Sequence, residues 1–343
     1  MQIGLLTDSL SELTRAEALD TAVDLGVETV EIGLGGVHGG WSPAPHADLA
    51  ELLDDGAARA GLARDVASRG LRLEAFNAAG NPLHPRHGER DAAVLRGALR
   101  LAQEFEIGTV VTMSGLPGGN PGALHQNWVV NAWNSAALDV LDHQWEIATE
   151  FWRETDRIAR DHDVTVALEL HPQNIVFNSA SVHELVERTG STHLGVELDA
   201  SHLFWQQMDP VAVVRHLGDL VVHAAAKDVR INPEHAALNG VLDNSFRRLG
   251  ADEPRTNLGG DEWANEWPTE SAWDFVALGK GHDVAYWTEF LRALHEVDPD
   301  MLVNIEHEDT ELGREEGVAV AAEVLLAADA ALTASLRTEP ARG

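Results

Sequence analysis

Eight short apolar or β-branched segments recur along nearly the whole chain, and longer segments of helical periodicity separate them. The predicted strands cover residues 3–7, 29–33, 72–77, 109–114, 165–171, 194–199, 220–228 and 302–308. Apolar residues recur at helical spacing between them, in segments such as 16–25, 90–105, 143–161, 182–189 and 211–217. This alternation predicts a parallel sheet with helices packed against it.

The number of strands and the first strand–helix connection distinguish two forms of such a sheet. A doubly wound open sheet is the main alternative, but no glycine-rich phosphate-binding motif follows the first strand. Eight strand–helix units favour a closed (β/α)8 TIM barrel, which suits a chain of 343 residues. We therefore predict an α/β fold with one barrel domain at 1–337 and a polar C-terminal tail at 338–343.

Two long stretches, 117–142 and 231–280, interrupt the repeat after the fourth and seventh strands. Long loops at the carboxyl ends of barrel strands usually form the active site. Both stretches contain tryptophan, at Trp128 and Trp133 in the first and at Trp263, Trp267 and Trp273 in the second. Exposed indoles suit a subunit interface almost as well, so we also expect a homo-oligomer or a complex with a small second subunit.

The charge balance excludes several kinds of partner. There are 24 Lys and Arg residues against 56 Asp and Glu residues, a formal net charge of −32, which repels nucleic-acid phosphates and anionic membranes. The chain contains no cysteine, so a metal site must use His, Asp and Glu. The N-terminus does not resemble a signal peptide, and the apolar stretch 317–336 contains two acids, as a packing helix does. We expect a cytoplasmic protein.

Acidic and histidine side chains stand where the last four strands end. They are Glu169 and His171, Asp199 and His202, His223 and Lys227, and Glu306. Three carboxylates that converge on one barrel mouth would repel one another unless a cation neutralised them. A single strand-end acid is better explained as a helix cap or a surface ion pair. Acids on the fifth, sixth and eighth strands together predict a divalent metal, Mn²⁺ by preference, with Mg²⁺ or Co²⁺ as alternatives.

Further side chains are assigned to catalysis and substrate binding. His171 is a candidate general acid or base, together with Glu169. Lys227 either stabilises an oxyanion or forms a buried salt bridge with Glu169 or Glu306. The predicted substrate-binding residues are Asn81, His84, Trp205 and His223, because amides, imidazoles and indoles suit a sugar or a glycoside.

At these positions the sequence resembles the xylose isomerase-like barrel family, which includes sugar isomerases, ketose epimerases and inosose dehydratases. The resemblance covers roughly residues 1–335. Members typically carry a metal-bound Glu at strand five, Asp at strand six with His three residues on, His at strand seven and Glu at strand eight. Glu169, Asp199 with His202, and Glu306 match that pattern. The resemblance implies a metal-dependent enzyme that acts on a sugar.

The seventh strand departs from the family pattern. Members commonly show His-x-His-x-Lys-Asp, in which the second His is the ligand, whereas this chain reads His-Ala-Ala-Ala-Lys-Asp from His223 to Asp228. Ala225 therefore stands at the ligand position. Either His202 completes the metal shell, or the metal site is weak or lost.

Several segments resemble the longer family members in particular. These are GNPLHP, SGLPGG, ELHP, NGVLD, GKGHD followed by Trp287, and IEHED. Such members include the metal-dependent subunits of C-glycoside deglycosylating enzymes, in which a His at the ELHP position is thought to move a proton on a 3-oxo sugar. That likeness implies the same role for His171.

We predict an isomerase- or epimerase-type enzyme that removes a proton next to the carbonyl of an unphosphorylated keto sugar. Departure of a leaving group instead would make it a lyase, such as a C-glycoside deglycosidase acting on a 3-oxo glycoside. A noncatalytic barrel subunit is the alternative outside enzymes, and Ala225 favours it. A metal-dependent endonuclease is disfavoured by the shortage of cations.

Overall fold

The computed structural model describes residues 1–35, 44–259, 262–309 and 311–338, and most of the predicted tail lies outside them. Eight parallel strands close into a barrel in the order β1-β12-β7-β6-β5-β4-β3-β2. They are β1 (Gln2–Leu6), β2 (Thr29–Gly33), β3 (Arg72–Asn77), β4 (Thr109–Met113), β5 (Thr165–Glu169), β6 (Leu194–Asp199), β7 (Val221–Ala226) and β12 (Leu302–Ile305). The predicted α/β TIM barrel is confirmed, with each strand at its predicted place in the sequence.

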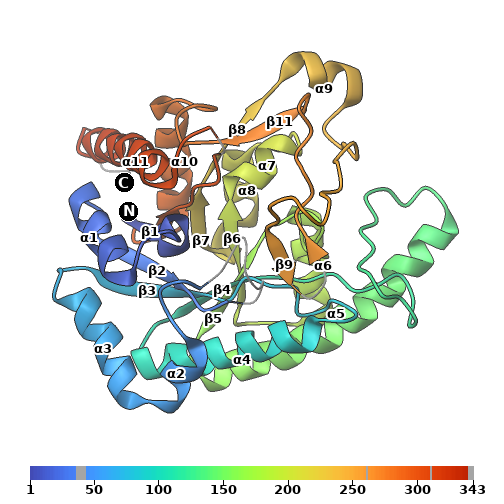
Figure 1. Cartoon of the computed structure of the whole chain (residues 1–343), viewed down its shortest axis with the longest axis horizontal. Coiled ribbons are helices and arrows are strands. Elements are labelled where there is room, and N and C mark those ends of the chain that lie inside the picture. The colour runs from blue at the N-terminus through green and yellow to red at the C-terminus, as the bar shows by residue number, and fades with distance from the viewer. Residues whose placement is uncertain (36–43, 260–261, 310, 339–343) are drawn as a thin grey trace.

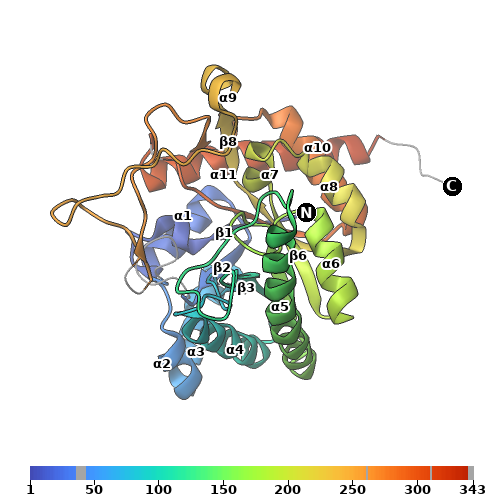
Figure 2. The same cartoon turned by 90° about the vertical axis from the view of Figure 1, so that its right-hand side faces the viewer.

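Helices surround these strands (Figure 2). The longer ones are α1 (Arg15–Leu25), α3 (Gly56–Ala67), α4 (Gly88–Phe105), α5 (Ser135–Asp161), α6 (Ser179–Thr189), α8 (Pro210–Leu217), α10 (Val284–Val297) and α11 (Arg314–Leu336). Shorter ones are α2 (Leu49–Asp54), α7 (Ala200–Trp205) and α9 (Pro233–Asn239), with 3-10 turns η1 (Thr7–Leu10) and η2 (Gly218–Leu220). Helix α5 begins well before the predicted residue 143, because the Asn134 side chain accepts a hydrogen bond from the Ala137 N–H and caps it there.

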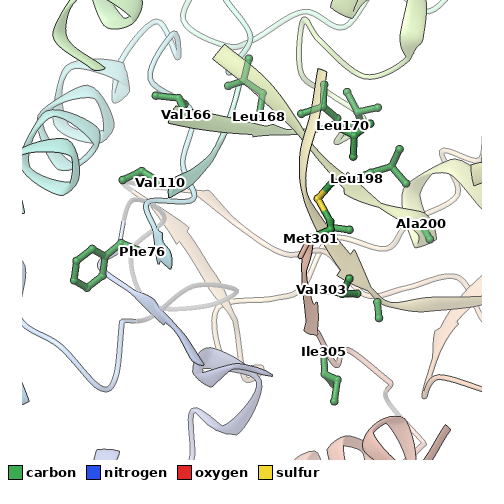
Figure 3. Packing of buried hydrophobic residues seen from close by; sticks show 14 of the residues in the cluster. Phe76, Val110, Val166, Leu168, Leu170, Leu198, Ala200, Met301, Val303 and Ile305 are labelled. Carbon is green, nitrogen blue, oxygen red and sulfur yellow. The ribbon is translucent and has the colours of Figure 1, made fainter. Parts of the chain in front are cut away.

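Strand alternation separates an apolar outer layer from a polar interior. Phe76, Leu168, Leu198 and Ile305 are at most 2% exposed and belong to one hydrophobic cluster, part of which Figure 3 shows. The next residue along each of these strands has the opposite orientation, and it is Asn77, Glu169, Asp199 and Glu306 in turn. The same strands therefore bury their outer faces under the helices and direct polar groups into the barrel.

The long connection after β7 has secondary structure of its own, in contrast to the structureless loop predicted from the sequence. It contains β8 (Asp228–Ile231), α9, β9 (Asn257–Gly259), β10 (Glu262–Trp263) and β11 (Trp273–Val276). Strands β8 and β11 pair antiparallel, and Figure 1 shows this ribbon and α9 at the upper right of the barrel. On the right of the same view, the loop after β4 and the start of α5 extend beyond the barrel.

Helix α11 is long and apolar enough to cross a membrane by length and composition. It nevertheless packs against α10 and α1, with Val318, Ala321, Leu325 and Leu332 almost fully buried. Its apolar residues therefore cover the barrel, as expected of a packing helix.

Two sequence motifs that lie about fifty residues apart form one structural unit. One carboxylate oxygen of Asp228, Oδ2, accepts hydrogen bonds from the N–H groups of Gly279, Gly281 and His282, each at 3.0 Å. The other oxygen lies 2.7 Å from Nδ1 of His282. At Gly281 a Cβ atom would approach the Val229 carbonyl oxygen to 2.1 Å, so only glycine fits. Asp228 thus anchors the GKGHD segment that follows β11.

Asp228→Ala should lower the free energy of unfolding by roughly 3 kcal/mol, since three backbone N–H groups would lose their shared acceptor. Urea unfolding followed by circular dichroism would measure the change. Asp219→Ala is the matched control, because Asp219 is exposed. Equal effects of the two substitutions would contradict the anchoring role.

Candidate metal and proton-transfer site

Three side chains from neighbouring elements meet where β5 and β6 end. The His202 Nε2 atom lies 3.2 Å from Oε1 of Glu169 and 3.2 Å from Oδ2 of Asp199. Asp199 is also the N-cap of α7, because its Oδ1 atom accepts a 2.8 Å hydrogen bond from the Ser201 N–H. Capping fixes the carboxylate so that Oδ2 faces His202, which α7 carries three residues further on. The structure thus brings together three of the four predicted metal ligands.

His171 lies beside this group, with its ring centroid 4.1 Å from that of His202. Its Nδ1 atom lies 2.6 Å from the Pro172 carbonyl oxygen, which can only accept a hydrogen bond. Nδ1 therefore carries the proton, and Nε2 keeps a free electron pair. Burial lowers the pKa of His171 and of His202 to about 4, so both rings are neutral at pH 7.

The electrostatics of this group fit a divalent cation. Neither ring nitrogen of His202 makes a hydrogen bond within the described chain, although the residue is only 3% exposed. Glu169, His171 and His202 offer ligand atoms that all lie within 4.8 Å of one another. Burial raises the pKa of Glu169 to about 7, as happens when a carboxylate lacks a compensating charge. Imidazole nitrogens and carboxylate oxygens together suit Mn²⁺, Co²⁺ or Zn²⁺.

The fourth predicted ligand, Glu306, is engaged elsewhere. Its Oε2 atom lies 3.5 Å from Nζ of Lys227, which is also 3.4 Å from Asp199 Oδ2 and 2.9 Å from Glu308 Oε2. Of the two roles considered for Lys227 in the sequence, the buried salt bridge with Glu306 is thus present. Burial alone would lower the pKa of Lys227, but these carboxylates raise it well above its ordinary value.

The predicted substrate-binding residues occupy three different places. Asn81 donates to Gln126 and accepts from the Leu116 N–H, so it joins two loops of the mouth. His84 stacks on His87 and lies 3.5 Å from Glu262, in the same group of loops. Asn81 and His84 contact loop residues, whereas the candidate metal ligands lie at the ends of β5 and β6.

Trp205 belongs to an aromatic wall beside the cluster. Its ring stacks on Trp273 at 4.8 Å between centroids, and Trp273 packs edge-to-face on Phe275. The Phe275 ring lies 5.7 Å from the His202 ring and 4.8 Å from the Lys227 ammonium. The β8–β11 ribbon therefore supplies an apolar boundary to the site.

His223 lies deeper in the barrel, where it is fully buried between two acids. Its Nε2 atom is 3.1 Å from Oε2 of Glu31, and its Nδ1 atom is 3.2 Å from Oε1 of Glu197. Asn77 and Asn304 donate to the two oxygens of Glu31. Burial works against a charged His223, but the two acids outweigh it and raise the pKa to about 10. This lower group has metal-ligand spacing, yet the imidazolium already supplies its positive charge.

The sequence reasoning did not identify Glu31, Glu197, Glu308 or Phe275 as site residues. Glu197 stands two residues before Asp199, so strand alternation places it on the same inner face, one layer deeper. Glu31 is the one acid in the buried strand β2, and an unpaired acid there would be costly. Both could have been found from these patterns. Phe275 belongs to the ribbon that the sequence did not reveal.

The histidines and carboxylates of the cluster lie at the carboxyl ends of the barrel strands, which is where the active sites of TIM-barrel enzymes are found. Residues 19–328 match the family described as "Xylose isomerase-like TIM barrel", and the chain belongs to this family. It is 32% identical over 330 residues to "Uncharacterized protein YfiH" of Bacillus subtilis (strain 168), a match that covers 95% of this chain and 98% of YfiH.

Solved structures share the fold at low sequence identity. The probable 3-DHS dehydratase AsbF of Bacillus anthracis is 15% identical with a TM-score of 0.63, over 95% of this chain and 99% of AsbF. The IOLI protein with a zinc atom is 17% identical with a TM-score of 0.61, over 97% and 99%. An L-ribulose 3-epimerase is 15% identical with a TM-score of 0.56, over 99% of both chains.

The lower group predicts loss of stability at alkaline pH. His223 has its pKa raised from 6.5 to about 10, so its contribution is complete below pH 6.5 and is lost as the pH rises through 10. Burial raises the pKa of Glu197 from 4.5 to about 8, so the folded protein also loses stability as the pH rises from 4.5 through 8 and this buried carboxyl ionises. The melting temperature of the metal-free protein should therefore fall between pH 7 and 10.

Glu197→Gln should make that fall shallower, because it removes one titrating group and reduces the proton affinity of His223. Differential scanning calorimetry across this pH range measures the slope. Glu187→Gln, at an exposed position on α6, is the control and should keep the wild-type slope. A wild-type slope in Glu197→Gln would show that the lower group does not titrate as stated.

Proposed function

We propose that this protein is a metal-dependent sugar isomerase or epimerase that removes the proton next to the carbonyl of a keto sugar. The observation that carries the proposal is the neutral His171, with a free Nε2, beside Glu169, Asp199 and His202. A base next to a site for a cation is what proton removal at such a carbon requires. Membership of the family, and the names of epimerases with the same fold, support this reaction class.

Glu169, Asp199 and His202 would hold the ion, with Mn²⁺ as the first candidate. A divalent ion bound there would polarise the substrate carbonyl and stabilise the negative charge that develops on its oxygen. Zinc and magnesium appear in the names of solved proteins with this fold, which supports a divalent cation in general.

His171 is the proposed base. The Pro172 carbonyl holds its Nδ1 proton, so Nε2 accepts the substrate proton and the ring becomes an imidazolium. Glu169 would hold the ion as a carboxylate, so the proton returns from the His171 imidazolium or, on the opposite face of the carbon, from water. Return to the neighbouring carbon gives an isomer, and return to the opposite face of the same carbon gives an epimer.

The surroundings favour a polar small molecule as substrate. A cavity of about 590 Å³ is lined by Arg230, Asn232 and His235 among others, and it shares Phe275 with the wall of the site but none of the four cluster residues. Such a volume suits a sugar-sized ligand. Arg230 is paired with Asp274 and Glu311, so it does not offer a free charge to a phosphate. An unphosphorylated sugar fits best.

Solvent deuterium should enter a keto sugar when it is incubated with the Mn²⁺-loaded protein in D₂O, because the removed proton exchanges with solvent. Proton NMR across a panel of ketoses and 3-oxo glycosides would record the exchange. His171→Asn should slow it about 10² to 10⁴-fold, which is the usual effect of losing a general base. His295→Ala, at a half-buried position on α10, is the control. Unchanged exchange in His171→Asn would rule out His171 as the base, and loss of a leaving group would assign an elimination instead.

Removal of the metal by a chelator should abolish the exchange, and added Mn²⁺ should restore it. His202→Ala should not be restored at the same Mn²⁺ concentration, because it lacks the nitrogen that faces Glu169 and Asp199. Metal content by mass spectrometry, measured beside His295→Ala, provides a readout independent of activity. Full metal content in His202→Ala would contradict the proposed ligand set.

A further inference from the structure

Ala225 leaves a place without a functional group on the inner wall of the barrel. It is fully buried on β7, in register with Asp199 on β6 and with Asn304 on β12. Alternation places 223, 225 and 227 on the same side of β7, and His223 is inside the barrel. A side chain with a ligand atom at 225 would therefore lie between Asp199 and Asn304 at the level of the cluster, but a methyl group offers none.

The Lys227 ammonium occupies this region from the next inward position. It lies within 3.5 Å of a carboxylate oxygen from each of Asp199, Glu306 and Glu308. Its side chain is only 5% exposed, and the ammonium stands 4.8 Å over the ring of Phe275. Three carboxylates therefore face the three N–H donors of one lysine.

One carboxylate oxygen belongs to both groups of charges. Asp199 Oδ2 is 3.2 Å from His202 Nε2 and 3.4 Å from Lys227 Nζ. An ion bound at His202 and the ammonium would thus lie close together and repel each other. Glu306 is on the lysine side of this boundary, because its Oε2 atom lies 3.5 Å from Lys227 Nζ.

We propose that Lys227 takes the place of a metal ligand on β7 and sets the metal affinity of the site. Its ammonium neutralises Asp199 and Glu306, retains Glu306 as an ion-pair partner, and confines the metal shell to Glu169, Asp199 and His202. This inference rests on the proposed metal-dependent function and assigns Lys227 as a positioning residue. Loss of this buried lysine should therefore tighten metal binding.

The test is calorimetric titration of Mn²⁺ into the metal-free full chain. In Lys227→Met the dissociation constant should fall roughly tenfold or more, because the repelling charge is gone and Glu306 is free to bind the ion. Lys227→Arg keeps the charge and should stay near the wild-type value. Lys280→Met is the matched control, since the chain has just one other lysine and its side chain is 37% exposed. Unchanged or weaker binding in Lys227→Met would overturn the inference.

Glu306→Gln gives a second measurement that does not depend on removing the lysine. In the wild-type background it should change Mn²⁺ affinity by no more than about threefold, because Glu306 serves Lys227. In the Lys227→Met background the same substitution should reverse the gain. Loss of binding in the single Glu306→Gln variant would show that Glu306 is a metal ligand, against the inference. This variant decides the question if Lys227→Met does not fold.

The two proposals fail in different experiments. Variants that change Mn²⁺ affinity as stated, in a protein that exchanges no deuterium into any keto sugar, would support the role of Lys227 and refute the proposed reaction. Deuterium exchange with equal Mn²⁺ affinity in wild type and Lys227→Met would support the proposed reaction and refute the role of Lys227. Absence of Mn²⁺ binding in both chains would overturn the inference about Lys227.

Discussion

The concentration of buried negative charge inside the barrel is the constraint on which the rest of the structure depends. Glu31, Glu169, Glu197 and Asp199 are all less than 10% exposed. Unpaired, each would cost several kcal/mol in a medium from which water is excluded. Among the described residues, His223 in the lower layer and Lys227 at the mouth are the buried cations that face these acids. Burial raises the pKa of Glu169 to about 7 even though Lys227 acts against the shift.

This distribution of charge explains why the site is located on one side of the mouth. In the lower layer both nitrogens of the His223 imidazolium face acids. Asn77 donates to the remaining oxygen of Glu31, Oε1, and Asn304 donates to Oε2, the oxygen that also faces His223. At the mouth, the Lys227 ammonium is surrounded by the carboxylates of Asp199, Glu306 and Glu308. Neutral His171 and His202 remain beside Glu169. A divalent ion would be stabilised most strongly there, because the carboxylates attract positive charge and the imidazole lone pairs can coordinate it.

The loops complete the site by hydrogen bonds between distant segments. Asp228 accepts hydrogen bonds from the N–H groups of residues 279, 281 and 282, and it thereby fixes the segment that follows β11 next to β8. Asn174 accepts from the Gly115 N–H and joins the loop after β5 to that after β4. On the paired ribbon, Phe275 and Trp273 lie beside His202, Lys227 and Trp205. A change in these anchors would alter the site without touching a residue of the cluster.

The sequence by itself determined the barrel and the strand ends that carry chemistry. Period-two alternation in short strands and helical periodicity between them act locally, so eight units could be read without tertiary contacts. For the same reason the positions of Glu169, Asp199 and Glu306 at the mouth followed from their places at the ends of β5, β6 and β12. The inward direction of Glu197 and His223 follows from the same alternation.

Tertiary structure alone decided which of these groups form ion pairs and hydrogen bonds with one another. Lys227 could pair with several acids at the mouth, and the choice of Asp199, Glu306 and Glu308 depends on the lengths of side chains across three strands. The β8–β11 ribbon depends on pairing between residues more than forty positions apart, for which the sequence has no local pattern. The location of the candidate metal site on the side of His171 and His202 follows from these contacts, because they determine where negative charge remains uncompensated.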